Sequence, residues 1–206
     1  AGSGAAVTDV LDVLGGTGNV GLGSGAFGTG LTTGTGNVAI GEAAGDALTS
    51  GDNNTFVGDN AGGGTTTVDH NTAVGSSALY TNSTGTQNTA VGSLALTKNA
   101  TGDYNTAVGY HALDESLGSF NTGLGTWALG SNTTGADNTA VGTNALSTAT
   151  TASDNTAVGR DSQENTTTGS NNTSVGAHSM EVNTTGAYNT AVGSGALDAN
   201  TTASNN

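Results

Sequence analysis

A five-residue core, Asn-Thr-Ala-Val-Gly in its commonest form, recurs along nearly the whole chain. Its copies begin at an Asn, at positions 19, 37, 54, 71, 88, 105, 121, 138, 155, 172 and 189, and Asn206 stands where a twelfth copy would begin. Of the eleven gaps in that series, nine are 17 residues, one is 18 and one is 16. A period this strict is typical of repeat architectures in which each unit stacks only on its neighbours. The chain is therefore expected to fold as a rod.

The composition fits an ordered array better than collagen or a disordered segment. Gly accounts for 36 of 206 residues without recurring at every third position, and Pro is absent, which excludes collagen and a Pro-rich linker. A chain rich in Gly, Ser, Thr and Asn is a candidate for disorder, but disorder gives no reason for Val, Leu and Ala to recur in fixed register. One continuous array is expected over residues 19–206.

The charge balance excludes two classes of partner. Sixteen acidic residues against Lys98 and Arg160 give a net charge of −14. Two cations cannot neutralise a phosphate backbone or bind an anionic membrane surface, so no nucleic-acid partner is expected. No apolar run approaches the ~20 residues of a membrane span.

Within each copy, numbered from its Asn as position 0, the residue types are those of a β-strand. Position 1 is Thr in nine copies and Val in two, while position 3 is aliphatic and position 4 is Gly in all eleven. β-Branched residues favour a pleated sheet, and Gly stands where a side chain would clash or φ must turn positive. Gly in every unit and the lack of a 3.6-residue stripe exclude helices.

Each unit is predicted to be one coil of an all-β parallel solenoid of eleven coils. The first strand covers positions 1–3, and a second short strand is expected at the Ala-Leu pair of positions 7 and 8. The later positions are polar and variable, as in an outer corner and return. Coils stacked at the strand spacing of ~4.8 Å make a rod roughly 50 Å long.

Three columns of stacked residues are predicted to hold the coils together. Asn at position 0 tolerates a left-handed corner, and its amide can bond the amides above and below. The aliphatic column is expected to be core, and Thr at position 1 to point inward with it, because residues two apart in a strand share a face. The predicted structural ladder comprises Asn54, Asn71, Asn88, Asn105, Asn138, Asn155, Val74, Val91, Val108, Gly75, Gly92 and Gly109.

The chain is also predicted to associate with itself. Position 2 is small in every copy except that of Phe56, so the strand is apolar or tiny on both faces, and both faces are expected to be covered. A thin single-chain solenoid with so little core would be marginal, and symmetric association is the usual remedy.

The stretch Asn37-Val38-Ala39-Ile40-Gly41 resembles the Asn-Ser-Val-Ala-Ile-Gly repeat of trimeric autotransporter adhesin heads, the YadA-like left-handed β-roll. Later copies are similar to the Asn-Thr-Ala-Val-Gly…Ala-Leu arrays of phage tail fibres and bacterial surface fibres. The resemblance covers residues 19–206 and implies a left-handed homotrimer, extracellular, on a cell surface or on a virion. It implies the chain itself as partner and a host-surface glycan or protein as candidate ligand. Those heads usually have a shorter repeat, so the outer corner here is longer.

Residues 1–18 depart from the repeat and form a separate segment from the array of residues 19–206. Their apolar stretch from Val7 to Leu14 is predicted to cap the first coil, or alternatively to join the next subunit by strand addition. The position of Asn206 suggests that the array continued, was processed there, or meets another molecule end-on.

No catalytic constellation can be assembled along the repeat, so the chain is expected not to be an enzyme. Its histidines, at corners of distant coils, exclude a shared zinc site or nucleophile pair and are predicted to be solvated. Glycosidase chemistry needs two carboxylates on opposite sides of a cleft, and a straight rod provides no cleft. No cofactor is expected; calcium is the alternative, sought first at the acids before the anchor Asn. The histidines are His70, His111 and His178, and the acids at which calcium would be sought are Asp52, Asp69 and Asp103.

Two surface features leave alternatives open. Trp127, Tyr110 and Tyr80 lie at outer positions, where isolated rings either stack on sugars or cover the corner. Sequons at position 11 predict an exposed corner and allow glycosylation; they begin at Asn82, Asn99, Asn132 and Asn183.

The expected function is that of a structural or adhesive fibre segment that spaces or presents a surface-binding element. The alternatives are an ice-binding solenoid with a Thr ladder and a filament assembled end to end. Two points oppose ice binding: Thr is expected to point inward, and only one Thr column is strict where ice binders tend to display two.

Overall fold

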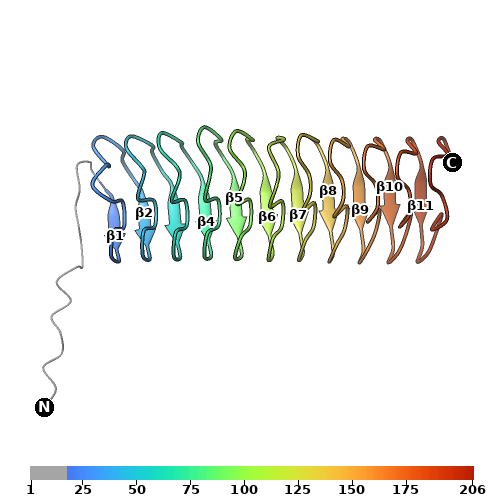
Figure 1. The fold of residues 1–206 in the computed structure, drawn as a ribbon, viewed down its shortest axis with the longest axis horizontal. Helices are drawn as coiled ribbons and strands as arrows, with labels where there is room; N and C mark the ends of the chain where they lie inside the picture. The colour runs from blue at the N-terminus through green and yellow to red at the C-terminus, as the bar shows by residue number, and fades with distance from the viewer. Residues whose placement is uncertain (1–17) are drawn as a thin grey trace, which may run out of the picture.

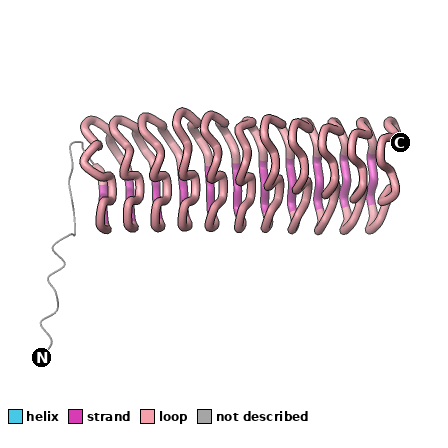
Figure 2. The backbone as a smooth tube through the Cα atoms, in the orientation of Figure 1, coloured by secondary structure: helices cyan, strands magenta, loops and turns pink. Residues whose placement is uncertain are grey.

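The computed structural model describes residues 18–206 and shows a straight stack of coils (Figure 1). One three-residue strand recurs in each coil, and the rest of the described chain is turn and loop with no helix (Figure 2). The strands are β1 Val20–Leu22, β2 Val38–Ile40, β3 Thr55–Val57, β4 Thr72–Val74, β5 Thr89–Val91, β6 Thr106–Val108, β7 Thr122–Leu124, β8 Thr139–Val141, β9 Thr156–Val158, β10 Thr173–Val175 and β11 Thr190–Val192.

The predicted cap or joint over residues 1–18 lies, apart from Gly18, outside the described residues. Over residues 18–206, no helix is long and apolar enough to cross a membrane.

All eleven strands form one parallel sheet whose order follows the chain from β1 to β11. Equivalent positions pair directly, and the two irregular repeats keep this register, with Val20 opposite Val38 and Val108 opposite Leu124. The extra residue of the first repeat and the missing residue of the sixth are therefore absorbed in the corners. The predicted parallel β-solenoid of about 17 residues per coil is confirmed.

The Gly at position 4 ends every strand because no other residue fits there. Its φ lies between 124° and 139° in all eleven copies, a region that L residues rarely adopt. A Cβ on Gly92 would also lie only 2.5 Å from the carbonyl oxygen of Gly109 in the next coil. The glycine column thus allows successive backbones to approach closely.

The interior is filled by small residues from the sheet and by Leu from the opposite wall. Ala73 at position 2, Ala78 and Leu79 are fully buried. The predicted second strand is wrong, because Leu79 lies in a turn with a φ of 53°. A left-handed Leu costs roughly 1–2 kcal/mol. The burial of its side chain offsets that cost, as does the hydrogen bond from its N–H to the carbonyl of Ala95, 2.9 Å away in the next coil.

The prediction that the aliphatic column forms the core is also wrong. Val74, Val91 and Val108 lie on the outer side of the sheet and are partly exposed, while Leu124 and Val192 expose 45% and 72% of their surface. Residues two apart do share a face, but it is the outer one, and Thr at position 1 lies there too. Since Leu from the opposite wall fills the interior, the sheet can contribute only a small residue to it.

Coils that break this pattern compensate within the interior. Phe56 replaces the small residue of the third coil and is fully buried. Gly45 and Gly62 stand where Leu is usual, and a Cβ on them would lie 2.7 Å and 2.5 Å from the Phe56 ring. The first coil makes the reverse exchange, with Gly21 at position 2 and Phe27 at position 8. Interior volume is therefore conserved around Phe56 and Phe27.

Candidate interaction face and the asparagine ladder

The anchor Asn side chains form a buried ladder along the rod. For Asn88, Nδ2 donates to the carbonyl of Gly102 in the same coil at 2.8 Å, and Oδ1 accepts the N–H of Asn105 in the next coil at 2.9 Å. In part of the ladder Nδ2 also donates to the preceding amide, as from Asn155 to Asn138 at 3.2 Å. Each side chain closes its own coil and joins it to the next. The buried members include Asn54, Asn71, Asn88, Asn105, Asn138 and Asn155.

The left-handed corner that we expected at this Asn falls one residue earlier. Gln87 and Tyr104, which precede Asn88 and Asn105, have φ values of 58° and 57°. Asn is required instead because its amide supplies both a donor across the coil and an acceptor along the rod. With both ends of the amide engaged by backbone groups, the ladder serves cohesion and offers no free atom to a ligand.

The outer side of the sheet carries what we call the Thr-aliphatic face, formed by positions 1 and 3 of the eleven strands. From Thr55 to Thr190, nine successive coils place Thr in register at position 1. No described residue accepts a hydrogen bond from these nine hydroxyls. The face therefore combines a row of free hydroxyls with a parallel row of aliphatic groups, roughly 7 Å apart across the strand. The inward orientation expected for Thr is wrong.

A second Thr column, interrupted by Ser83, Ala100 and Leu117, runs along the corner at position 12, and the sequence analysis did not predict it. The hydroxyls of five of its members are engaged, because each donates to the carbonyl of its counterpart in the next coil; these are Thr49, Thr133, Thr150, Thr167 and Thr184. Thr150 Oγ1 reaches Thr167 O at 3.1 Å, and Thr167 Oγ1 reaches Thr184 O at 3.1 Å. The recurrence of Thr at this position was the available signal. The column joins coils and adds no free hydroxyl to the Thr-aliphatic face.

Exposed aromatic rings gather on the fifth, sixth and seventh coils, where they stack on rings of neighbouring coils. The ring centroids of Tyr104 and Phe120 are 5.0 Å apart with planes 6° from parallel, and those of His111 and Trp127 are 4.3 Å apart at 5°. Because these separations match the spacing of neighbouring coils, the planes lie across the rod axis and show their edges to solvent. A sugar stacks on ring faces, so this arrangement favours the covering role for Trp127.

Two of the histidines are paired with carboxylates, contrary to the expectation that all would be solvated. His111 Nδ1 lies 2.8 Å from Asp114 Oδ2, and His178 Nδ1 lies 2.7 Å from Glu181 Oε2. Each carboxylate follows its histidine by three residues, a spacing that could have been noticed in the sequence. His70 remains at an exposed corner.

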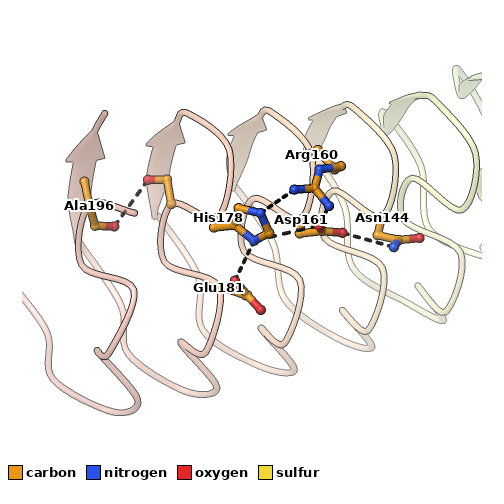
Figure 3. Close-up of polar contacts among 7 residues, drawn as sticks. Asn144, Arg160, Asp161, His178, Glu181 and Ala196 are labelled. Atoms are coloured by element: carbon orange, nitrogen blue, oxygen red, sulfur yellow. Dashed lines mark hydrogen bonds and ion pairs between the residues drawn. The ribbon is translucent and has the colours of Figure 1, made fainter. Parts of the chain in front are cut away.

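The second pair belongs to a charged cluster that spans three coils (Figure 3). Asp161 accepts a hydrogen bond from Asn144 Nδ2 at 3.0 Å and pairs with Arg160 at 3.0 Å, while Arg160 Nη2 lies 2.6 Å from His178 Nε2. These groups satisfy one another and link neighbouring coils. Beside them, partial burial and the nearby carboxylates of Asp161 and Glu181 raise the pKa of Glu164.

The acids before the anchor Asn act as caps between coils. Asp52 Oδ1 accepts the backbone N–H of Thr35 at 2.7 Å, and Asp103 Oδ1 accepts that of Thr86 at 2.7 Å. This hydrogen bond lowers the pKa of Asp52. Over residues 18–206, no group of three His, Asp or Glu side chains could hold a metal ion.

The sequons at position 11 do not mark an exposed corner. Asn82, Asn99, Asn132 and Asn183 are fully buried, and Asn82 Nδ2 donates to Gly85 O at 2.7 Å. A glycan cannot be attached to an amide that is buried inside the coil. The signal for this inward role is the Gly that follows each Asn after three residues.

Comparison with protein families, with curated proteins and with solved structures found no match for this chain. The resemblance to YadA-like heads therefore stays a prediction.

Proposed function

We propose that the chain is a segment of an extracellular fibre, in which copies of the solenoid pack side by side through their Thr-aliphatic faces, most simply as a homotrimer. Such a fibre spaces or presents a surface-binding element at a cell surface or on a virion. The observation that carries the proposal is the unbroken aliphatic column on the outer side of the sheet, from Leu22 to Val192. A regular apolar stripe along a soluble rod is typical of a surface that is covered in the assembly.

The dimensions of the face fit this role. Eleven strands of three residues form a face of roughly 50 Å by 10 Å, or about 500 Å² per chain. The exposed residues that border the strands on either side increase this area to about 1,000 Å². A stable interface buries roughly 800 Å² per partner, so strand face and borders together suffice. The rod itself suits a spacer, since each coil is bonded to the next through the sheet and through the Asn ladder.

The test places charges on the aliphatic column in alternate coils and compares native masses by light scattering. The triple variant Val74→Lys, Val108→Lys and Val141→Lys is expected to shift the protein to the mass of one chain, 19.6 kDa, with the β spectrum retained. The matched control carries Thr84→Lys, Thr134→Lys and Thr168→Lys at an exposed corner and is expected to keep the parent mass. Equal masses for both variants would contradict the proposal.

Ice binding is a second candidate, favoured by the outward row of nine free Thr hydroxyls. Spaced at ~4.8 Å along a flat sheet beside methyl groups, these hydroxyls can order water in a regular array. The two candidates exclude each other, because a face covered by other copies cannot meet ice. A protein with the mass of one chain that shows thermal hysteresis, lost in Thr89→Lys and kept in Thr84→Lys, would support ice binding and contradict the fibre.

A further inference from the structure

The Thr-aliphatic face has two borders, whose residues differ from coil to coil. The leading border is the residue before the anchor Asn, which is exposed in every coil from Asn53 to Tyr188. The trailing border consists of positions 5 and 6, which follow the Gly at the end of the strand. Because both borders lie outside the repeating columns, they can distinguish one coil from another.

Exposed aromatic rings occur at the same level on both borders only beside β6 and β7, over the part of the chain that the structure describes. Tyr104 precedes β6 and Tyr110 follows it, while Phe120 precedes β7 and Trp127 follows it. Tyr104 stacks on Phe120, and Trp127 stacks on His111. These stacks leave the ring edges on both borders free to contact another molecule.

The two borders also carry opposite charges at one level, beside β9. Asp154 precedes this strand, and Arg160, the one arginine of the chain, follows it. Asp154 is exposed, and no described residue bonds to its carboxylate. Arg160 pairs with Asp161 but still exposes 62% of its side chain. Rings on one border thus lie at the level of rings on the other, and an acid lies at the level of a base.

We propose that the leading border of one chain contacts the trailing border of the next chain in a parallel assembly, and that these residues fix the axial register. The inference rests on the proposed function, because it requires copies that pack side by side through the Thr-aliphatic face. Around a three-fold axis parallel to the rods, every contact joins unlike borders of two chains at equal height. The rings beside β6 and β7 then meet rings of the next chain, and Asp154 meets Arg160.

The repeat itself does not fix this register. A slide of one coil, ~4.8 Å, places Thr beside Thr and Val beside Val again, so the columns of the face match nearly as well. The same slide leaves Tyr104 opposite Ser93, and Asp154 opposite Thr143. The border residues therefore favour one register among several that the columns alone would allow.

Trp127 is the single tryptophan of the chain and reports the ring contact by its fluorescence. Phe120→Ser removes the ring that meets Trp127 from the next chain, so we expect acrylamide quenching of Trp127 to rise by up to about twofold. The matched control is Tyr188→Ser, which removes an exposed ring from the same border. Beside β11 the trailing border carries only Ser194 and Gly195, so quenching in this variant should stay that of the parent.

A second background separates contacts between chains from effects within one chain. Phe120→Ser is combined with the three Lys substitutions that are expected to give single chains. There it should leave the quenching unchanged, because within one chain Phe120 stacks on Tyr104 and Trp127 stacks on His111. The same rise in quenching in single chains would overturn the proposal.

Exchange of the charges tests the second contact. Asp154→Arg is expected to raise the concentration at which the assembly dissociates by about tenfold, since three contacts per trimer become repulsive. Adding Arg160→Asp should restore the parent value. Asp137→Arg, one coil earlier on the same border and opposite Thr143, should leave that concentration unchanged.

The outcomes distinguish this inference from the proposed function. Equal quenching and equal mass in Phe120→Ser and Tyr188→Ser, in a protein with the mass of three chains, would overturn the register contact and leave the fibre standing. A loss of mass confined to Phe120→Ser would support the contact. A mass of one chain for the unmodified protein would contradict the fibre itself.

Discussion

Replacing Gly92 by Ala tests whether the glycine column sets the close approach of the coils. Gly92 has a φ of 132°, and its Cβ would lie 2.5 Å from the carbonyl oxygen of Gly109, where ordinary contact begins at 3.4 Å. The backbone strain costs about 1–3 kcal/mol. Relief of the overlap must push β5 and β6 apart and weaken the bonds beside it, such as Gly109 N–H to Val91 O at 2.8 Å, at about 1 kcal/mol each. The expected loss is about 4 kcal/mol in the free energy of unfolding.

Substitutions at two other glycines measure the backbone strain separately from the steric overlap. Gly193 has a φ of 124° but nothing within 4 Å of its Cβ, so Gly193→Ala should cost only the strain, about 1–3 kcal/mol. Gly30 has neither problem, since a Cβ there would meet its nearest atom at 3.5 Å, and Gly30→Ala should be neutral or stabilise by about 0.5 kcal/mol. Denaturant unfolding followed by circular dichroism measures all three. A loss in Gly92→Ala no larger than in Gly193→Ala would refute the steric argument.

Three further predictions concern single contacts. Asn105→Ala removes a rung of the ladder and leaves Gly118 O and the Asn121 N–H unpaired, so we expect a loss of about 2–4 kcal/mol and faster amide exchange at Asn121; unchanged exchange would contradict the ladder. Phe56→Ala alone is expected to lower the free energy of unfolding by about 3–5 kcal/mol, and Gly62→Leu alone is expected to lower it as well. The double variant restores the usual residues of the coil, so it should lose less than the sum of the two single variants, with a coupling energy above about 1 kcal/mol. Additive losses would contradict the volume exchange. Burial and neighbouring carboxylates raise the folded-state pKa of Glu164. Above that pKa the charged carboxylate therefore destabilises the fold. This destabilisation disappears as the pH falls toward the pKa of Glu in the unfolded chain, 4.5. Glu164→Gln should therefore raise the unfolding midpoint at neutral pH, by an amount that shrinks on acidification, whereas a constant difference would contradict this assignment.

The repeat predicted the architecture because the coil length and the in-phase strands both follow from the spacing of the anchor Asn. It also located the glycine column, since a Gly in every copy requires a backbone reason such as the φ of Gly75. These are properties of the backbone that every coil shares. Periodicity reports them directly.

The two faces of the sheet could not be assigned from residue type alone. Val74 and Thr72 look like core residues, and Ala73 looks like a spacer, but the interior is narrow and already filled by Leu79 from the opposite wall. Size exchange within a coil was the available signal: where Phe56 occupies position 2, Gly62 occupies position 8. That exchange makes sense only if positions 2 and 8 share the interior.

The predictions of a second strand and of exposed sequons were wrong for a related reason. Leu is rarely left-handed, so no propensity argument would place Leu79 at a φ of 53°; the stacked bonds of neighbouring coils override the local preference. The sequon predicts an exposed Asn82, but the amide of Asn82 points inward and donates a hydrogen bond to Gly85 O. In a thin solenoid, polar side chains hold the interior together where a larger domain would use apolar ones.

The measurement that tests the fibre proposal most directly is small-angle X-ray scattering of the unmodified protein, which gives mass and rod dimensions together. Side-by-side packing through the Thr-aliphatic face predicts a mass of three chains of 19.6 kDa and a length that stays close to that of one solenoid, roughly 50 Å. A mass of one chain would contradict the proposal and direct attention to ice binding. A mass that grows together with the length would also contradict it, because the chains would then be joined end to end.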